Sequence, residues 1–404
     1  MAADEAQQRP WQRASDAEKA EGVTGQNNLA FEELNKPRYH LAAAADGDDA
    51  IDESFEIGVV DMSAVLRSSE EGGEAARAAF AAELGLALEE MGFAVLVGHG
   101  VDLALHEAAH ARTPLLFTSN TDDRKAAFRA ERFGAVNQGW FPMEETSNLH
   151  PDQVEGWVWC RRAFRLPGGL GDQGTGGSQL AEYWPSGAGE EEFWRAHVLA
   201  HERLAAPIFR AMLDRVGVAQ PEPLVEALNE PAFALRLNYY PPATGDVGAK
   251  VMDQGAGRMV GHEDVDLFTL LPAPSSPGLQ ALNPRTQKWV RVTAPPGSII
   301  VNTGDYAQRL FSDHFPSTTH RVTPPPEEYK AQPRTSFPMA VYLPEDFVLT
   351  CLPECGEPRY PPMTSLDFHT STNRKYYGED YRATGADGKG SAGVKPEAAV
   401  AAKL

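Results

Sequence analysis

The sequence predicts an α+β protein whose C-terminal half is mainly β, a sandwich or barrel, preceded by a helix-rich part. From Phe233 onward, short runs rich in β-branched and aromatic residues are separated by Pro and Gly, which is typical of sandwiches and barrels. Upstream, apolar residues recur at threes and fours over residues 75–91, 103–117 and 190–216, which predicts helices. Pro207 should interrupt the last helix, because its ring cannot continue a helix interior. The predicted strands are residues 57–62, 93–97, 235–240, 278–282, 289–292, 298–302, 319–323 and 337–343.

The composition limits the kinds of partner. The chain carries 36 Lys and Arg against 57 Asp and Glu, and its net charge of −21 repels nucleic acid and anionic membrane surfaces. Its start has no basic region followed by an apolar one, and no run of about 18 apolar residues occurs, so neither secretion nor a membrane span is expected. Cys160, Cys351 and Cys355 are too few and too far from spare histidines to indicate a zinc site or a disulfide framework. We therefore expect a cytoplasmic protein that binds neither nucleic acid nor membrane.

Four segments are expected along the chain. Residues 1–54 carry charge, alanine and glycine without a sustained period and should form a mobile extension. Residues 55–232 should form the helix-rich part, residues 233–382 the β core and residues 383–404 a disordered tail. The last three residues, Ala402-Lys403-Leu404, resemble the relaxed form of the Ser-Lys-Leu peroxisomal signal, which has a meaning only in a eukaryote. Chance in an alanine-rich tail is the alternative.

The candidate site lies within residues 261–336, where His262, Asp264 and His320 occur in a suggestive order. Residues 261–271 are predicted as one strand, on which side chains two apart point to the same side. His262 and Asp264 would then face one ligand and be joined by His320 from a distant strand. Two imidazoles and one carboxylate are the facial triad of non-haem Fe(II) oxygenases, which leaves open positions on the metal. From spacing alone, structural histidines are the alternative.

Five segments that surround this triad occur in the order of a known family. They are LNYYPP at 237–242, GHEDVDLFTLL at 261–271, PGSIIVNTGD at 296–305, STTHRV at 317–322 and RTSFP at 334–338. With them the chain resembles the isopenicillin N synthase-like family of Fe(II)/2-oxoglutarate-dependent oxygenases, over about residues 55–380. The resemblance extends to DMS at 61–63 and MGFAVLVGHGV at 91–101. It implies a double-stranded β-helix, the jelly-roll of cupin-like proteins, with flanking helices.

The resemblance also implies which residues hold the cosubstrate. The far carboxylate of 2-oxoglutarate would meet Arg334 and Ser336, because a guanidinium fork and a hydroxyl suit a buried carboxylate. Asn238 and Tyr240 match the other cosubstrate contacts of the family. The sequence departs from the family at Thr335, where a tyrosine is usual, and this change is expected to alter the floor of the cosubstrate pocket.

The implied activity is that of a dioxygenase that uses Fe(II), 2-oxoglutarate and O2. Oxidative decarboxylation of 2-oxoglutarate to succinate and CO2 would accompany hydroxylation, desaturation or cyclisation of a small organic molecule. Two alternatives stay open. HEDV at 262–265 is close to the pattern of members that dispense with 2-oxoglutarate and hold the substrate's own carboxylate with the equivalent Arg and Ser. A catalytically silent binding protein of the same fold is the second alternative, and the intact triad argues against it.

Other candidate sites have weaker support. His99 could be a ligand, but a family-typical Gly-His-Gly turn is favoured. His197 and His201 are four apart on a predicted helix, which is ligand spacing, yet no third ligand is near in sequence and a buried helix face is favoured. Residues 169–174 match GxGxxG but lack the strand before and the helix after that a dinucleotide site needs. The aromatic segments 137–142 and 157–162 are expected either at the substrate mouth, as in the family, or packed outside the barrel.

Overall fold

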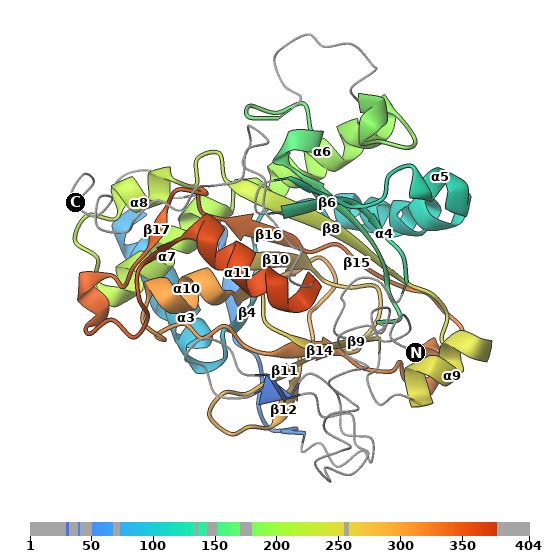
Figure 1. The fold of residues 1–404 in the computed structure, drawn as a ribbon. Helices are drawn as coiled ribbons and strands as arrows, with labels where there is room; N and C mark the ends of the chain where they lie inside the picture. Colours follow the sequence, from blue (N-terminus) through green and yellow to red (C-terminus); the bar gives the residue numbers. More distant parts are fainter. Residues whose placement is uncertain are drawn as a thin grey trace, which may run out of the picture.

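The structure, a computed structural model, describes residues 30–31, 39–40, 51–67, 73–133, 136–143, 152–169, 180–253 and 258–377. Figure 1 shows strands gathered at the centre with helices around them. The expected disordered tail and most of the expected mobile extension lie outside the described residues. Residues 51–54 are described and contact the smaller sheet, where the Asp52 N–H donates to the carbonyl of Trp289 at 2.9 Å. The division of the chain at 55, 233 and 383 stays a prediction.

Two sheets face each other across a cavity that both of them line. The ten-stranded sheet has the order β3 (Val59–Asp61), β4 (Phe93–Val97), β13 (Ile299–Thr303), β10 (Phe268–Pro272), β16 (Met339–Tyr342), β8 (Ala232–Tyr240), β7 (Glu155–Cys160), β6 (Val136–Phe141) and β5 (Glu131–Phe133), with β15 (Arg334–Ser336) also paired to β8. The four-stranded sheet has the order β12 (Trp289–Arg291), β11 (Leu279–Leu282), β14 (His320–Val322) and β9 (Met259–His262). This pair of sheets with flanking helices confirms the predicted jelly-roll.

Within the two sheets, neighbouring strands are antiparallel except for β3 and β4. Two short ribbons complete the described strands: β1 (Ala30–Phe31) with β2 (Tyr39–His40), and β17 (Val348–Leu349) with β18 (Met363–Thr364).

Strand β8 separates two environments, because successive side chains of a strand point to opposite faces of the sheet. One set of its side chains lines the cavity between the sheets: Ala234, Arg236, Asn238 and Tyr240. The other set packs into an aromatic core on the far face of the sheet: Phe233, Leu235 and Leu237. Polar residues in the first set are therefore available to a ligand, and apolar residues in the second hold the helices.

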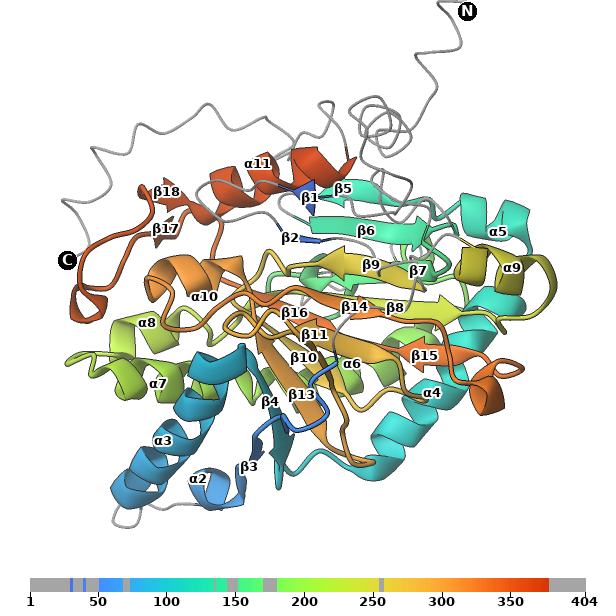
Figure 2. The same ribbon diagram turned by 90° about the horizontal axis from the view of Figure 1, so that it is seen from below.

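Helices lie around the two sheets, as Figure 2 shows from below. The longer ones are α3 (Gly73–Met91), α4 (Leu103–Thr118), α6 (Ala188–Glu202), α7 (Ala205–Val216), α9 (Gly245–Asp253) and α11 (Ser365–Tyr377). The short ones are α2 (Ser63–Arg67), α5 (Asp122–Ala126), α8 (Glu222–Glu226) and α10 (Asp305–Leu310). Helix α3 packs against α7, and α4 packs against β8 and β15. Among the described residues, no helix is long and apolar enough to cross a membrane.

The predicted helices agree closely with the structure. The helices expected at 75–91 and 103–117 are α3 and α4, and the interruption expected at Pro207 separates α6 from α7. The break falls just before the proline, which lies in the first turn of α7, where its missing N–H costs no intrahelical hydrogen bond. Between α3 and β4, Gly92 adopts a φ of +70°, and a Cβ there would lie 2.3 Å from the Pro316 carbonyl oxygen. Only glycine fits this turn without strain.

The prediction of one strand over residues 261–271 is wrong. Strand β9 ends at His262 and β10 begins at Phe268, and the two belong to different sheets. Between these strands the chain crosses from one sheet to the other. Two of its backbone carbonyls accept hydrogen bonds from N–H groups in the first turn of α10. The Asp305 N–H donates to the Asp264 carbonyl at 2.8 Å, and the Tyr306 N–H donates to the Asp266 carbonyl at 2.9 Å. These long-range bonds outweigh the local β propensity of the segment.

Candidate active site

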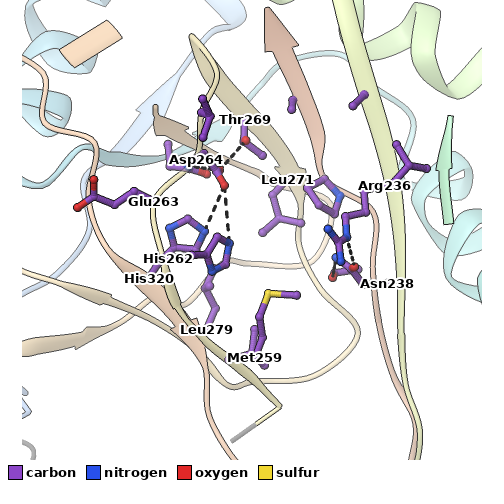
Figure 3. Close-up of a pocket in the computed structure, with 18 of the residues that line it drawn as sticks. Arg236, Asn238, Met259, His262, Glu263, Asp264, Thr269, Leu271, Leu279 and His320 are labelled. Carbon is purple, nitrogen blue, oxygen red and sulfur yellow. Dashed lines mark hydrogen bonds and ion pairs between the residues drawn. The ribbon is translucent and has the colours of Figure 1, made fainter. Parts of the chain in front are cut away.

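The three residues predicted as metal ligands lie together at one end of the cavity (Figure 3). His262 is the last residue of β9, His320 is the first residue of β14, and the two are paired across the strands. Asp264 lies two residues after the end of β9. Its Oδ1 lies 3.7 Å from Nε2 of His262 and 3.8 Å from Nε2 of His320. Both nitrogens therefore face the same carboxylate oxygen.

Two buried side chains orient the other oxygen of this carboxylate. Asn302 Nδ2 donates to Asp264 Oδ2 at 2.8 Å, and Thr269 Oγ1 lies 2.7 Å from the same oxygen. Burial raises the pKa of Asp264, but His320, His262 and these hydrogen bonds outweigh burial, so the pKa is below its usual value. The carboxylate is thus held ionised with Oδ1 turned toward the imidazoles. Asn302 lies in the PGSIIVNTGD segment, but nothing in the residue pattern assigned it a role.

A second aspartate completes a chain of hydrogen bonds behind the triad. Thr269 Oγ1 also lies 2.7 Å from Oδ2 of Asp266. Burial, together with the nearby charges of Asp264 and Asp305, raises the pKa of Asp266 well above its usual value. A protonated Asp266 can donate to the Thr269 hydroxyl, which then donates its own proton to Asp264, so each of the two contacts has one proton.

The histidine on β14 is oriented in the same manner. His320 Nδ1 lies 3.1 Å from the carbonyl oxygen of Thr318, and an N–H there leaves Nε2 with its lone pair toward Asp264. Phe93 packs edge-on against the ring, with centroids 5.6 Å apart. Two imidazole nitrogens and one carboxylate oxygen on one wall of an open cavity are the donor set that Fe(II) takes in a facial triad. The residues present therefore fit the metal.

A cationic anchor lies on the paired strands β8 and β15. Arg334 is opposite Tyr240, and Ser336 is opposite Asn238, so all four side chains share one face of the sheet. Arg334 is 1% exposed, its Nη1 lies 3.5 Å from Ser336 Oγ, and its guanidinium stacks over the ring of Tyr240 at 4.9 Å. Asn238 Nδ2 lies 3.4 Å from the same hydroxyl. Burial lowers the pKa of Arg334.

The guanidinium of Arg334 has no carboxylate partner among the described residues. A buried charge without a counter-ion is costly, and a ligand carboxylate that takes two N–H groups of the fork would remove that cost. The four residues that the sequence predicted as cosubstrate contacts are thus brought together around one cation.

The cavity between these two groups has a volume of about 240 Å³. Its remaining walls are largely apolar, and the side chains include Phe93, Phe141, Val158, Met259, Leu271, Leu279, Val322, Ala340 and Tyr342. One cation interrupts them: Arg236, whose Nε donates to Asn238 Oδ1 at 2.9 Å and which lies over the ring of Phe141 at 5.6 Å. Figure 3 shows Arg236 across the cavity from the triad. Arg236 was not among the residues predicted from the sequence, although its alternation with Asn238 and Tyr240 on β8 indicates the same face of the strand.

Thr335 and His99 lie outside the cavity. Thr335 points to the far side of β15, where its Oγ1 lies 2.7 Å from His110 Nδ1, so the expectation that it alters the cosubstrate pocket is wrong. The cause is the alternation of side chains along a strand. The His99 ring bonds the Gly297 carbonyl and the Val101 N–H, as the predicted turn requires.

The aromatic segments divide between both expectations. Phe141 and Val158 line the cavity, whereas Trp157 and Trp159 pack on the far face of the sheet. Residues 170–174 of the GxGxxG match lie outside the described residues.

Comparison with known proteins identifies the class. Residues 231–340 match the model of the 2OG-Fe(II) oxygenase superfamily, and residues 57–168 match the model described as non-haem dioxygenase in morphine synthesis N-terminal. Gibberellin 3-beta-dioxygenase 1 of Oryza sativa subsp. japonica is 30% identical over 331 residues, which cover 78% of this chain and 74% of that protein. The chain therefore belongs to the 2OG-Fe(II) oxygenase superfamily.

Solved structures agree in fold. A full-length Neurospora crassa protein, solved in complex with alpha-KG and thymine, superposes with a TM-score of 0.66 at 20% identity and covers 81% of this chain and 100% of that one. A 2OG-Fe(II) oxygenase family protein from Caulobacter crescentus has a TM-score of 0.62 at 25% identity, with 81% and 99% covered. The expected family and enzyme class are confirmed: the chain is an oxidoreductase of the type that uses Fe(II), 2-oxoglutarate and O2.

Proposed function

We propose that His262, Asp264 and His320 hold the Fe(II) of this dioxygenase, and that Arg334 and Ser336 hold the far carboxylate of 2-oxoglutarate. The observation that carries the proposal is the buried guanidinium of Arg334, which lies beside a hydroxyl and has no carboxylate partner within the described chain. Asn238 and Tyr240 complete the cosubstrate site by fixing the hydroxyl and the guanidinium.

Bound iron would be the site at which O2, the oxidant, is activated, and 2-oxoglutarate would supply two of the four electrons that O2 accepts as it is decarboxylated to succinate and CO2, while the substrate supplies the other two. The protein's own residues position the reactants. Asn302 and Thr269 keep the Asp264 carboxylate ionised and turned toward the imidazoles, and the Thr318 carbonyl sets the tautomer of His320. Largely apolar walls bound the space between the triad and Arg236, where a substrate carbon can be oxidised.

The substrate that fits this cavity is a small, largely apolar organic molecule with one anionic or carbonyl group. Phe141 and Val158 offer an apolar surface, and Arg236 is the cation that would meet the polar group. The net charge of −21 disfavours nucleic acid as a partner. We place the protein in the cytoplasm or, if its source is a eukaryote and the Ala402-Lys403-Leu404 tail is read, in peroxisomes.

The test is iron-dependent turnover of 2-oxoglutarate. Protein reconstituted with Fe(II) should release succinate and consume O2, and a substrate should stimulate both. His262→Ala and Asp264→Ala should each abolish this turnover, because one donor of three is lost, whereas His314→Ala, at an exposed histidine, should retain it. Full activity in either triad variant would contradict the assignment of ligands.

A 2-oxoglutarate-independent oxidase is the alternative reaction. It would consume O2 with its substrate when no 2-oxoglutarate is present, and Arg334 would then hold a carboxylate of that substrate. A catalytically silent binding protein would neither consume O2 nor release succinate with any substrate offered.

A further inference from the structure

Three histidines gather on the face of the large sheet opposite the cavity. His106 lies on α4, while His197 and His201 lie one turn apart on α6. Each offers a ring nitrogen within 4.8 Å of those of the other two, and their exposed fractions are 3%, 0% and 0%. In Figure 1 both helices lie on the same side of the sheet, near β8. The pairing of His197 with His201 was visible in the sequence, but the third histidine is 91 residues away from the nearer of them.

The hydrogen bonds of this cluster leave nitrogens directed at one another. His201 Nδ1 donates to the carbonyl of His197 at 2.7 Å, so the lone pair of His201 resides on Nε2. That atom lies 3.1 Å from Nε2 of His106. The remaining nitrogen of His106 and both nitrogens of His197 are buried without a hydrogen-bond partner. Buried polar atoms are rarely left in this state, and here three occur in one cluster.

The surroundings keep these rings neutral. Burial lowers the pKa of His201 to about 3 and that of His106 to about 4, and it lowers the pKa of His197 well below the usual value. The rings of Trp194 and Phe337 pack against His197, with centroids 5.4 Å and 5.2 Å away. At neutral pH the cluster therefore presents uncharged imidazoles, which is the form that binds metal ions.

The distances suit a metal of the zinc class. Two imidazole nitrogens at about 2.0–2.1 Å from one Zn²⁺ in tetrahedral geometry are separated by roughly 3.4 Å. The observed separation of His106 Nε2 from His201 Nε2 is 3.1 Å, close to this value. The His197 ring is stacked on that of His201, with centroids 4.2 Å apart, and offers a nitrogen within 4.8 Å of the other two. The bond from His201 Nδ1 to a backbone carbonyl is the outer contact that metal-bound histidines usually make.

We propose that His106, His197 and His201 form a second metal site, separate from the triad, which takes a divalent cation of the Zn²⁺ class. Three protein nitrogens would leave one position for a small ligand such as water. The ion would join α4 to α6 behind Phe337, the residue that directly follows the proposed cosubstrate strand β15. This role is structural and does not depend on the proposed function of the triad.

Two neighbouring histidines are excluded from the site, and one of them, His110, serves as a control. His99 bonds the Gly297 carbonyl and the Val101 N–H. His110 bonds Thr335 Oγ1 at 2.7 Å and the carbonyl of Ala273 at 2.9 Å. Both nitrogens of each ring are thus engaged, so His110→Gln should leave the proposed site intact.

The experiment measures metal stoichiometry on the full chain without an affinity tag. Co²⁺ is titrated into metal-free protein, the bound metal is quantified after gel filtration, and the visible absorption of Co²⁺ reports low-coordinate histidine ligation. We expect two equivalents for the wild type and for His110→Gln. His106→Gln and His197→Gln should each retain the Co²⁺ equivalent bound at the triad. Each should lose the equivalent bound at the histidine cluster, because the affinity of the cluster for Co²⁺ falls at least about tenfold. The double variant His262→Ala/His320→Ala should retain the cluster equivalent.

One equivalent in the wild type, absent from the His262→Ala/His320→Ala protein, would overturn the proposal. Two equivalents of bound Co²⁺ in a folded His197→Gln protein would also overturn the proposal. If the glutamine variants do not fold, the double triad variant decides alone: saturable Co²⁺ binding with a tetrahedral spectrum supports the site, and no binding overturns it. Because this variant lacks the proposed iron ligands, its result is independent of whether the chain turns over 2-oxoglutarate.

Discussion

Replacing Arg334 with leucine separates the cosubstrate assignment from its alternative. Arg334 is 1% exposed, and its Nε donates to the Ser276 carbonyl at 3.2 Å, so the guanidinium is fixed from behind. The other edge of the fork is left for a ligand carboxylate. Leucine fills much of the same volume without a charge, and a carboxylate bound there would keep only the Ser336 hydroxyl and its neighbours.

The loss of a charge-assisted partner for a buried carboxylate costs about 2–5 kcal/mol. This range corresponds to a decrease in affinity of roughly thirty-fold to several-thousand-fold. The lower end applies if Ser336 and Tyr240 still bond the carboxylate, and the upper end applies if the carboxylate is left unpaired. Free protein should not lose stability, because the substitution removes a buried charge that has no carboxylate partner in the described chain.

The assay is the Michaelis constant for 2-oxoglutarate, obtained from succinate release, together with thermal stabilisation of the iron-loaded protein by 2-oxoglutarate without O2. Arg334→Leu should raise the Michaelis constant for 2-oxoglutarate steeply and abolish the thermal stabilisation by 2-oxoglutarate. Binding of the primary substrate should change little. Arg236→Leu is the matched control. It should lower the affinity for the primary substrate and leave the Michaelis constant for 2-oxoglutarate within about threefold of the wild-type value. Turnover without 2-oxoglutarate, together with an Arg334→Leu protein that chiefly binds a carboxylate-bearing substrate more weakly, would contradict the cosubstrate role of Arg334.

Three further outcomes are expected. Asn302→Leu removes a bond to Asp264 and should weaken Fe(II) binding by about 10–100-fold, measured by iron titration; unchanged affinity would contradict its orienting role. Burial lowers the pKa of His369 to about 4 from its usual 6.5, so its contribution to stability is complete above pH 6.5 and is lost as pH falls toward 4. Between pH 7 and 5 the free energy of unfolding, measured with urea, should fall by about 1–2 kcal/mol more for the wild type than for His369→Gln. Equal decreases in the two proteins would refute this expectation. A fluorescent protein carrying residues 395–404 should collect in peroxisomes of a eukaryotic cell and disperse without Leu404, whereas diffuse signal from the intact tail would end that hypothesis.

Sequence alone predicted the family and the fold class, and it singled out the residues of the proposed site. His262, Asp264, His320 and the Arg334-x-Ser336 pair were selected by residue types that suit a metal and a carboxylate, together with the resemblance of the surrounding segments to a known family. The helices at 75–91 and 103–117 were predicted to within two residues, since helix periodicity is a local property of the chain.

Tertiary structure decided how these residues meet. Asp264 was expected on a strand with His262, but it lies in a crossing between sheets, where backbone bonds from α10 hold it. Asn302 and Thr269 orient its carboxylate from two other strands, and neither type of side chain is diagnostic in a sequence. Likewise, His106 joins His197 and His201 only because α4 and α6 pack on the same face of the large sheet. Periodicity reports contacts within a few residues, whereas the partners of these side chains depend on which strands pair and which helices pack together.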